Sequence, residues 1–390
     1  MKLLVISYDW PPMIGGKATI LHELFSRIGE DISVIAAKED GYEALDKKES
    51  FMIARIPKFF FNIPLLPFFR PYIIKIIFLY LKAKEIALKE KPDLIMCGQL
   101  LTEGAVGLCL KKELGIPYII YTFDTIDVEL PLNGRDKKLA KEILLNAEKV
   151  VCISSYMKRK LIDIGIEKGR VVMVMPGIDT KEFFPGKPAQ EIVERTSHGK
   201  NKIVLTVARL VDRKGIDYAI NAFSLVKKEI PDSKMVIVGD GPERANLEKI
   251  ARDLGLENDV VFAGKMVGHE LVNYYNASDV FVLPSTVNEK EFKSEGFGVV
   301  FLEAAACGKP VIGTRTAGIV DAVEENVTGI LVEQRNTGQL ADAMIKILSD
   351  KNLAQKLGQN GRDRAVREFD WSIVARNFEK NVLGKMDVGK

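Results

Sequence analysis

The amino-acid sequence predicts an α/β protein of two domains, each built on a doubly wound parallel sheet. The chain has 390 residues, which is more than one ordinary hydrophobic core accommodates. Short apolar runs, typical of parallel strands buried on both faces, alternate with helical segments through both halves. This alternation favours right-handed βαβ units and a parallel sheet covered by helices.

The composition is that of a soluble globular protein, with 47% apolar and 28% charged residues. A net charge of +3 is too small for the chain as a whole to indicate nucleic-acid binding. The run 1–7 is typical of a strand rather than a secretory leader. The cysteines lie far apart in apolar contexts without Cys-x-x-Cys spacing, which predicts buried thiols in a reducing compartment. They are Cys97, Cys109, Cys152 and Cys307. We therefore expect a cytoplasmic protein.

Residues 1–185 are expected to form the N-terminal domain. Its predicted strands are 3–7, 32–36, 52–56, 94–97, 118–123, 150–153 and 171–174. A turn-rich loop follows the first of them, and a helix is predicted over 17–28. Gly15 and Gly16 end this loop at the start of the helix, the position at which such folds bind phosphate.

The segment 186–201 is polar and lacks apolar periodicity, so we interpret it as the interdomain linker. Residues 202–370 follow as the C-terminal domain. Its predicted strands are 203–208, 235–238, 260–264, 279–284, 310–314 and 329–332. The two halves therefore repeat one architecture.

The stretch 279–314 carries the most specific chemistry of the chain. It is predicted to form a strand, a polar loop, a helix over 299–306 and a second strand, and Gly296-Phe297-Gly298 opens the helix. The amides near Gly298, Val299 and Val300 have no partner inside the helix. With the positive end of the helix dipole they form an anion site.

Two carboxylates flank this helix start, with seven residues between them. Glu295 lies on the loop before the helix, and Glu303 lies more than one turn inside it. Ionised carboxylates suit sugar hydroxyls because they accept hydroxyl hydrogen bonds. The spacing alone is weak evidence, since a capped helix with two solvated acids would look the same.

Two cations follow the strand 203–208. Arg209 and Lys214 stand at the end of that strand and ahead of a helix, where they can neutralise two phosphates. Either cation alone would more often be an ordinary surface residue.

Taken together, these motifs resemble those of retaining nucleotide-sugar glycosyltransferases of the GT-B type, family 4 (glycosyl transferases group 1). The matching features are Pro-Pro-x-x-Gly-Gly at 11–16, Ala-Arg-Leu and Lys-Gly within 208–215, and the Glu-x7-Glu stretch with its Gly-Lys-Pro exit. The resemblance implies two Rossmann-like domains facing a cleft, with the nucleotide sugar in the second and the acceptor in the first. It also implies that the C-terminal helix, about 371–390, packs back on the first domain.

The resemblance implies a role for single residues as well. Arg209 and Lys214 should hold the donor diphosphate, Glu303 the ribose and Glu295 the sugar ring, while the backbone at 265–266 should read the nucleobase. The expected donor contacts are Gly15, Gly16, Arg209, Lys214, Gly239, Lys265, Met266, Glu295, Gly296, Phe297, Gly298, Val299, Val300 and Glu303. The expected catalytic residues are Asp124, Glu295, Arg209 and Lys214.

One position departs from the family pattern. Many members carry a histidine at the equivalent of Asp124, whereas the histidines of this chain are elsewhere. Asp124 or Asp127 would then make the polar contact to the sugar, or Asp124 would orient or deprotonate the acceptor hydroxyl. The alternative is a helix-capping acid, since aspartate is favoured there.

The segment 55–91 is both apolar and basic, with eight Lys and Arg residues against two Glu, a net charge of +6. Its prolines and embedded charges interrupt any run of the roughly 20 apolar residues that a transmembrane helix needs. Two interpretations stay open. One is a core helix with a packed loop, and the other is an amphipathic surface at the inner face of the cell membrane that admits a lipid-linked acceptor.

The expected activity is that of a hexosyltransferase that moves a sugar from a UDP- or GDP-sugar to a hydroxyl acceptor, with a lipid-linked glycan as one candidate. No Asp-x-Asp motif or His/Cys/Asp cluster offers metal spacing, so neither a metal nor a cofactor is expected. Retention of the anomeric configuration is implied by the family alone. The alternatives are a nucleotide-sugar 2-epimerase of GT-B fold and a non-enzymatic two-lobed sugar-binding protein.

Overall fold

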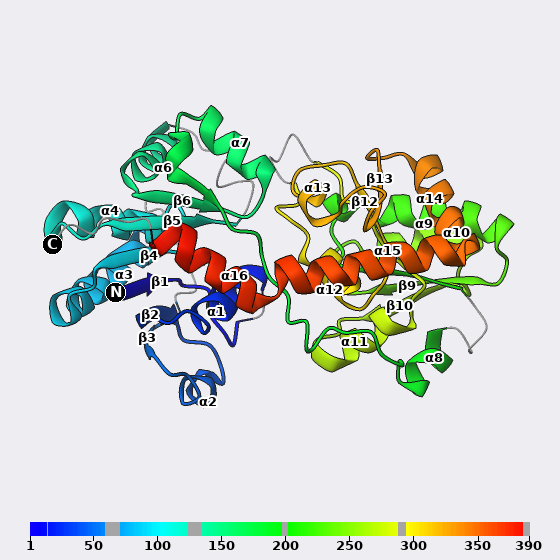
Figure 1. Ribbon diagram of the computed structural model, residues 1–390, viewed down its shortest axis with the longest axis horizontal. Coiled ribbons are helices and arrows are strands. Elements are labelled where there is room, and N and C mark those ends of the chain that lie inside the picture. Colours follow the sequence, from blue (N-terminus) through cyan, green and yellow to red (C-terminus); the bar gives the residue numbers. More distant parts are fainter. Residues whose placement is uncertain (14, 59–70, 124–133, 197–201, 288–293, 385–390) are drawn as a thin grey trace. The chain divides into compact units, whose positions relative to one another are not determined.

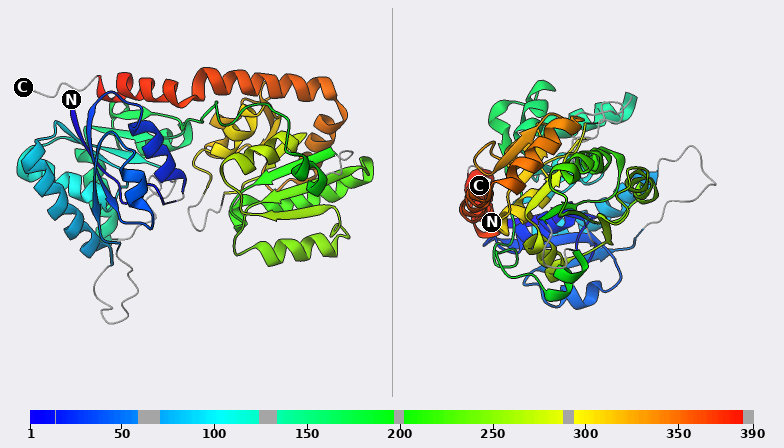
Figure 2. Two further views of the ribbon diagram at one scale, coloured as in Figure 1. Left: turned by 90° about the horizontal axis from the view of Figure 1, so that it is seen from below. Right: turned by 90° about the vertical axis from the view of Figure 1, so that its right-hand side faces the viewer.

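The computed structural model describes residues 1–13, 15–58, 71–123, 134–196, 202–287 and 294–384 (Figure 1). The chain divides into two compact units. Unit 1 comprises Met1–Met175 and Trp371–Lys390, and unit 2 comprises Pro176–Asp370. Helices flank the sheet of each unit on both sides (Figure 2).

Unit 1 contains a seven-stranded parallel sheet in the order β3-β2-β1-β4-β5-β6-β7. Its strands are β1 Lys2–Ile6, β2 Asp31–Ala37, β3 Met52–Ile56, β4 Leu94–Cys97, β5 Tyr118–Thr122, β6 Lys149–Cys152 and β7 Val171–Met173. Its helices are α1 Gly16–Phe25, α2 Tyr42–Asp46, α3 Pro71–Glu90, α4 Glu103–Leu114, α6 Gly134–Asn146, α7 Ser155–Asp163 and α16 Trp371–Phe378. The central strands are apolar on both faces because helices cover both.

Unit 2 contains a six-stranded parallel sheet in the order β10-β9-β8-β11-β12-β13. Its strands are β8 Lys202–Val207, β9 Ser233–Val238, β10 Val260–Gly264, β11 Val280–Leu283, β12 Val311–Thr314 and β13 Gly329–Val332. Its helices are α8 Gln190–Thr196, α9 Ile216–Glu229, α10 Arg244–Asp253, α11 Gly268–Ala277, α12 Val299–Ala306, α13 Ile319–Ala322, α14 Thr337–Ser349 and α15 Lys351–Arg364.

The predicted fold class, two doubly wound parallel-sheet domains, is confirmed. In both units the chain starts in the middle of the sheet, builds outward to one edge, then returns and builds toward the other. The order reverses between β1 and β4 in unit 1, and between β8 and β11 in unit 2. Ligands of such sheets bind outside the carboxyl ends of the strands at this point of reversal.

Some local features differ from the sequence-based expectation. Part of the predicted linker 186–201 is helical: it contains α8, and Ile192 of this helix is buried. Backbone N–H groups just before α8 donate to Asn276 and Asn273 of α11, at 3.0 Å each. A single buried apolar residue leaves no periodic pattern, so the sequence could not reveal this helix. Cys109 is exposed rather than buried.

The C-terminal helix α16 belongs to unit 1. Phe378 is fully buried, with its ring edge-on to Phe25 at 5.8 Å between centroids and stacked on Tyr121 at 6.4 Å. The buried Lys149 donates to the carbonyl of Val382 at 2.5 Å, and Glu379 accepts from the Gly29 amide at 2.8 Å. The segment is therefore held by aromatic packing and by two polar contacts to backbone groups.

We expect Phe378→Ala to lower the free energy of unfolding of unit 1 by about 3–5 kcal/mol, because it leaves a cavity between two aromatic rings. Both tryptophans of the chain, Trp10 and Trp371, belong to unit 1, so tryptophan fluorescence during chemical denaturation follows this unit selectively. Phe78→Ala is the control, since that side chain is 43% exposed and its loss should cost less than about 1 kcal/mol. Equal destabilisation by the two variants would contradict the packing described for α16.

Candidate active site

The predicted site residues of unit 2 gather at the carboxyl ends of β8 and β11. These two strands are parallel neighbours, with Val204 opposite Val280 and Leu205 opposite Phe281. The loop after β8 carries Arg209 and Lys214, and the loop after β11 leads to Glu295. Lys214 and Glu295, 81 residues apart in the sequence, therefore meet where the strand order reverses.

Backbone contacts join the two loops. The Thr286 amide donates to the carbonyl of Arg213 at 2.8 Å. Gly215 adopts a left-handed conformation, with φ of 63°, and a Cβ at this position would lie 2.1 Å from the carbonyl oxygen of Pro284. Only glycine permits this approach, so the turn that carries Lys214 sits directly against the β11 loop.

The carboxylate of Glu295 is the charged centre of the site. Its Oε2 forms an ion pair with Lys214, lies 3.3 Å from Nη1 of Arg213 and accepts from the Ser285 hydroxyl at 3.5 Å. The side chain is 13% exposed. Burial raises the pKa of this carboxyl, but Lys214 and Arg213 together outweigh burial and hold the pKa below its ordinary value. Glu295 is therefore ionised at neutral pH.

The start of α12 is fixed beside this carboxylate. Gly298 caps the helix with φ of 92°, and a Cβ there would lie 2.8 Å from the ring of Phe301. The Gly318 amide donates to the carbonyl of Glu295 at 3.1 Å, and a Cβ at Gly318 would lie 1.9 Å from the carbonyl oxygen of Gly296. Phe297 is buried against Phe369, so its backbone rather than its ring is left to meet a ligand.

Glu303 has a different environment on the second turn of α12. The hydroxyl of the buried Tyr275, on α11, donates to its Oε2 at 2.6 Å. Burial raises the pKa of Glu303 to about 7, although the hydrogen bond from Tyr275 acts in the opposite direction. The two carboxylates of the site thus have pKa values displaced in opposite directions.

The remaining predicted donor contacts of unit 2 follow three neighbouring strands, β8, β9 and β10. Arg209 is exposed just after β8. A Cβ at Gly239 would lie 1.8 Å from the carbonyl oxygen of Ala208, so this glycine lets the β9 turn pack beneath the β8 loop. Lys265 and Met266 follow β10, the edge strand, which β9 separates from β8.

In unit 1, Gly15 and Gly16 stand at the start of α1. Among the described residues, apart from chain neighbours and the backbone of α1 itself, no atom lies within 4 Å of a Cβ at either position. The space around them permits close approach by a ligand. Asp124 and Asp127 lie outside the described residues, so their roles stay predictions.

Sequence reasoning missed a buried cluster at the corresponding point of unit 1, between β1 and β4. Glu103 is fully buried at the first turn of α4 and accepts from the Tyr8 amide at 3.0 Å. The ammonium of Lys75, from α3, lies 3.9 Å from Oε1 of Glu103 and 3.9 Å from the centre of the Tyr8 ring. The one available signal was an acid at the start of the helix that follows the strand 94–97.

Two residues of unit 2 were also missed. Arg213 stands next to Lys214 in the motif after β8, and that adjacency was the signal that could have identified it. Tyr275 carried no signal, because a tyrosine on an amphipathic helix is normally a core residue. Within the described ranges, no cluster of three or more His, Cys, Asp or Glu side chains could hold a metal ion.

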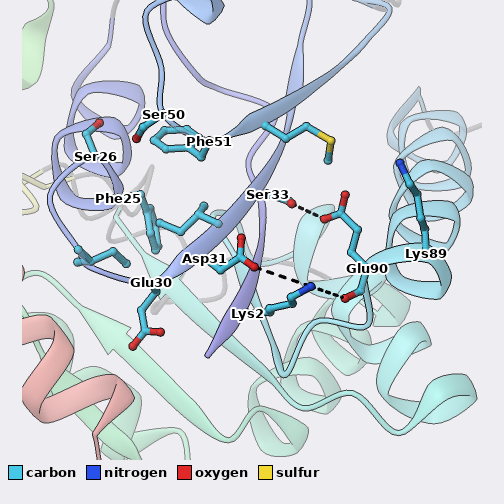
Figure 3. Close-up of a pocket in the computed structure, with 13 residues that line it drawn as sticks. Lys2, Phe25, Ser26, Glu30, Asp31, Ser33, Ser50, Phe51, Lys89 and Glu90 are labelled. Carbon is cyan, nitrogen blue, oxygen red and sulfur yellow. Dashed lines mark hydrogen bonds and ion pairs between the residues drawn. The ribbon is translucent and has the colours of Figure 1, made fainter.

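The described residues also line a cavity of about 460 Å³ beside the amino ends of the unit 1 strands, away from their carboxyl ends (Figure 3). It opens at the amino ends of β1, β2 and β3. Its polar groups contact one another: Ser33 donates to Glu90 at 2.5 Å, and Lys2 lies 3.8 Å from Asp31. The predicted site residues of unit 1 that the structure describes, Gly15 and Gly16, follow the carboxyl end of β1 instead.

Two doubly wound domains, with two cations, an ionised carboxylate and a helix N-terminus at one switch point, are typical of GT-B glycosyltransferases. Residues 14–182 match Glycosyltransferase Family 4, and residues 189–364 match Glycosyl transferases group 1. The chain therefore belongs to the family 4 glycosyltransferases.

Known relatives agree with this assignment. A GDP-mannose-dependent alpha-(1-6)-phosphatidylinositol monomannoside mannosyltransferase of Mycobacterium tuberculosis is 33% identical over 60% of this chain and 61% of its own length. The match therefore spans about three fifths of that relative. A protein of the same name from Mycolicibacterium smegmatis is 26% identical over 99% of both chains. The crystal structure of Anabaena HepE in complex with UDP shares the fold, with a TM-score of 0.80 and 21% identity over 98% of this chain and 100% of that one.

We expect Glu303→Gln to change how the stability of unit 2 depends on pH. The folded protein keeps a proton on Glu303 that the unfolded chain releases between about pH 4.5 and 7, so this group's contribution to stability falls as pH rises through that window. Relative to the wild type, the variant should gain stability between about pH 5 and pH 7, at up to about 1.4 kcal/mol per pH unit.

Circular dichroism during chemical denaturation measures this change, since unit 2 contains no tryptophan. Tyr275→Phe is the companion variant. It removes the hydrogen bond that lowers the pKa of Glu303, so the pH range over which Glu303 costs stability should extend to higher pH. A stability difference between Glu303→Gln and wild type that does not vary with pH would contradict this environment.

Proposed function

We propose that this chain is a retaining, metal-independent glycosyltransferase that moves a sugar from a nucleotide-diphosphate sugar to a hydroxyl acceptor. The observation that carries the proposal is the ionised Glu295, held by Lys214 beside the N-terminus of α12. Cations and helix amides suit a diphosphate, and a carboxylate next to them suits the hydroxyls of an attached sugar. Membership of the family supports the same reaction class.

The chain's own residues would stabilise the leaving group. Breaking the anomeric bond leaves negative charge on the β-phosphate, which Arg209, Lys214 and the amides of 298–300 would face. Because Lys214 and the start of α12 are fixed by the loop contacts described above, they need little reorganisation as the charge develops. They would take the part that a divalent cation plays in metal-dependent enzymes.

Glu295 and Glu303 would orient the two ends of the donor. Glu295 stays ionised and would accept hydrogen bonds from the sugar ring, while Glu303 would receive the ribose hydroxyls. Retention follows from front-face attack, in which the leaving phosphate takes the proton of the acceptor hydroxyl. Asp124 is the alternative base and stays a prediction.

The names of the relatives favour guanine or uracil as the donor base and a lipid-linked acceptor. The mycobacterial proteins are named as GDP-mannose-dependent and as acting on phosphatidylinositol monomannoside, whereas HepE was solved with UDP. We therefore propose a GDP- or UDP-sugar as donor and a lipid-linked acceptor. The Lys75 and Glu103 cluster would lie on the acceptor side, since it occupies the switch point of unit 1.

The exposed side chains of α3 favour this helix as the part of the chain that contacts the inner face of the cell membrane. Its large exposed apolar side chains are Ile73, Ile77, Phe78, Leu81 and Leu88. Four of these recur at spacings of four or seven residues, and so lie on one side of the helix. None of the helices in the described part of the chain has the length and apolarity of a bilayer-spanning segment.

The basic charge of α3 is partly neutralised in the structure. Lys75 pairs with the buried Glu103, Lys82 with Glu85, and Lys84 with Glu113. We therefore propose that apolar insertion contributes more to membrane binding than attraction to anionic lipid.

Purified protein should transfer sugar from GDP- or UDP-sugars to a lipid-linked hydroxyl acceptor, equally well with and without EDTA, and NMR should show a retained anomer. Thermal shift with UDP, GDP and ADP selects the donor base first. Arg209→Gln should lower kcat/KM by about 10²–10³, because it removes a cation from the leaving phosphate.

Each alternative has its own signature in this assay. Consumption or isomerisation of the donor without acceptor would favour the epimerase, and tight binding without turnover would favour the sugar-binding protein. Loss of activity in EDTA with recovery in Mn²⁺ or Mg²⁺ would refute metal independence, and an inverted product would refute retention.

In liposome flotation, the wild-type protein should bind vesicles, and the double variant Ile77→Glu with Leu81→Glu should not, because charge on this face opposes insertion. Leu254→Glu is the matched control, since it is an exposed leucine of unit 2. Binding that survives the double variant would exclude α3 as the membrane contact.

A further inference from the structure

Arg213 and Lys214 are consecutive residues whose side chains both reach Glu295. The Nη1 of Arg213 lies 3.3 Å from Oε2 of Glu295, and Lys214 pairs with the same oxygen. The Ser285 hydroxyl also donates to Oε2, at 3.5 Å. All three of these contacts are made to Oε2 of the carboxylate.

Under the proposed function, Lys214 has two anionic partners. Its ammonium is now paired with Glu295, whereas a bound diphosphate would present a stronger concentration of negative charge. If Lys214 turned to the phosphate and nothing replaced it, the mostly buried Glu295 would lose its main compensating charge. A carboxylate in that state takes up a proton, because burial disfavours its charged form.

Arg213 is placed to replace Lys214. A guanidinium has five N–H donors in a fixed plane, so this side chain can hold a carboxylate without a second cation. Its backbone is anchored, since its carbonyl accepts the Thr286 amide at 2.8 Å. The side chain is 31% exposed, compared with 12% for Lys214.

We propose that Arg213 is the positioning residue that keeps Glu295 ionised and correctly oriented while Lys214 binds the donor diphosphate. The inference rests on the proposed function and adds a residue to that site. In this division of labour Lys214 serves the leaving group, and Arg213 serves the carboxylate that holds the sugar.

Within the described part of the chain, the groups that face Glu295 come from three loops, so its titration should be open to measurement. Arg213 and Lys214 come from the β8 loop, and the Ser285 hydroxyl from the β11 loop. The loop after β12 contributes the Gly318 amide, which donates to the backbone carbonyl of Glu295. Because Arg213 is one of only two cations in this set, its removal must raise the pKa of Glu295.

The test compares Arg213→Gln, Arg213→Lys and the control Arg367→Gln, which breaks an exposed ion pair with Glu368. The acid limb of the kcat/KM profile should move up by about one pH unit in Arg213→Gln. At the pH of that limb, kcat/KM should fall about tenfold. Arg213→Lys should recover most of the loss, and Arg367→Gln should behave as wild type.

Binding of the nucleoside diphosphate alone, by calorimetry with UDP or GDP, separates the two cations. Arg213→Gln should leave this affinity within about twofold, whereas Lys214→Ala should lower it more than about tenfold. An unmoved acid limb, or an affinity loss in Arg213→Gln as large as in Lys214→Ala, would overturn the inference. Failure of the wild-type protein to bind either nucleotide would instead overturn the proposed function.

A further readout needs no substrate. Since the pKa of Glu295 is lowered in the folded protein, this group contributes stability above its ordinary pKa, and that contribution is lost as pH falls. Arg213→Gln should therefore destabilise unit 2 at neutral pH and less in acid. Destabilisation that does not vary with pH would show that Arg213 acts on packing alone.

Discussion

The ion pair between Lys214 and Glu295 is the interaction on which the site of unit 2 depends. Both side chains are mostly buried, and each charge would be costly without the other. The pair forms because two parallel strands from different parts of the chain end side by side. Gly215 and Gly318 then bring the loops closer than any residue with a Cβ could. The ion pair is thus the product of backbone geometry as much as of charge.

The two carboxylates of this site show how environment assigns different roles to one side-chain type. Glu295 faces two cations and keeps its charge, whereas Glu303 faces the hydroxyl of Tyr275 in a buried setting and titrates near pH 7. An ionised group accepts hydrogen bonds only, while a group near its pKa can also donate. The two acids of the site therefore have different hydrogen-bonding capacities.

Both units place a carboxylate and a lysine at the point where their strand order reverses. In unit 2 these are Glu295 and Lys214, on loops that follow β11 and β8. In unit 1 they are Glu103, at the start of α4, and Lys75, which reaches in from α3. The shared topology explains the shared location, because parallel strands that diverge from one point leave room there for loop side chains. The lysine comes from a loop in unit 2 and from helix α3 in unit 1, which leaves the two sites chemically distinct.

The sequence by itself determined the strand and helix order, the class of fold and the residues of the helix start at Gly298. These features are local: apolar runs, glycine turns and short motifs are all readable along the chain. Only the tertiary structure showed that Arg213 and Tyr275 belong to the site of unit 2, and that Glu103 and Lys75 form a cluster in unit 1. It also decided that the pKa values of Glu295 and Glu303 are displaced in opposite directions. Those properties depend on burial and on neighbours far away in the sequence, and no spacing along one chain encodes them.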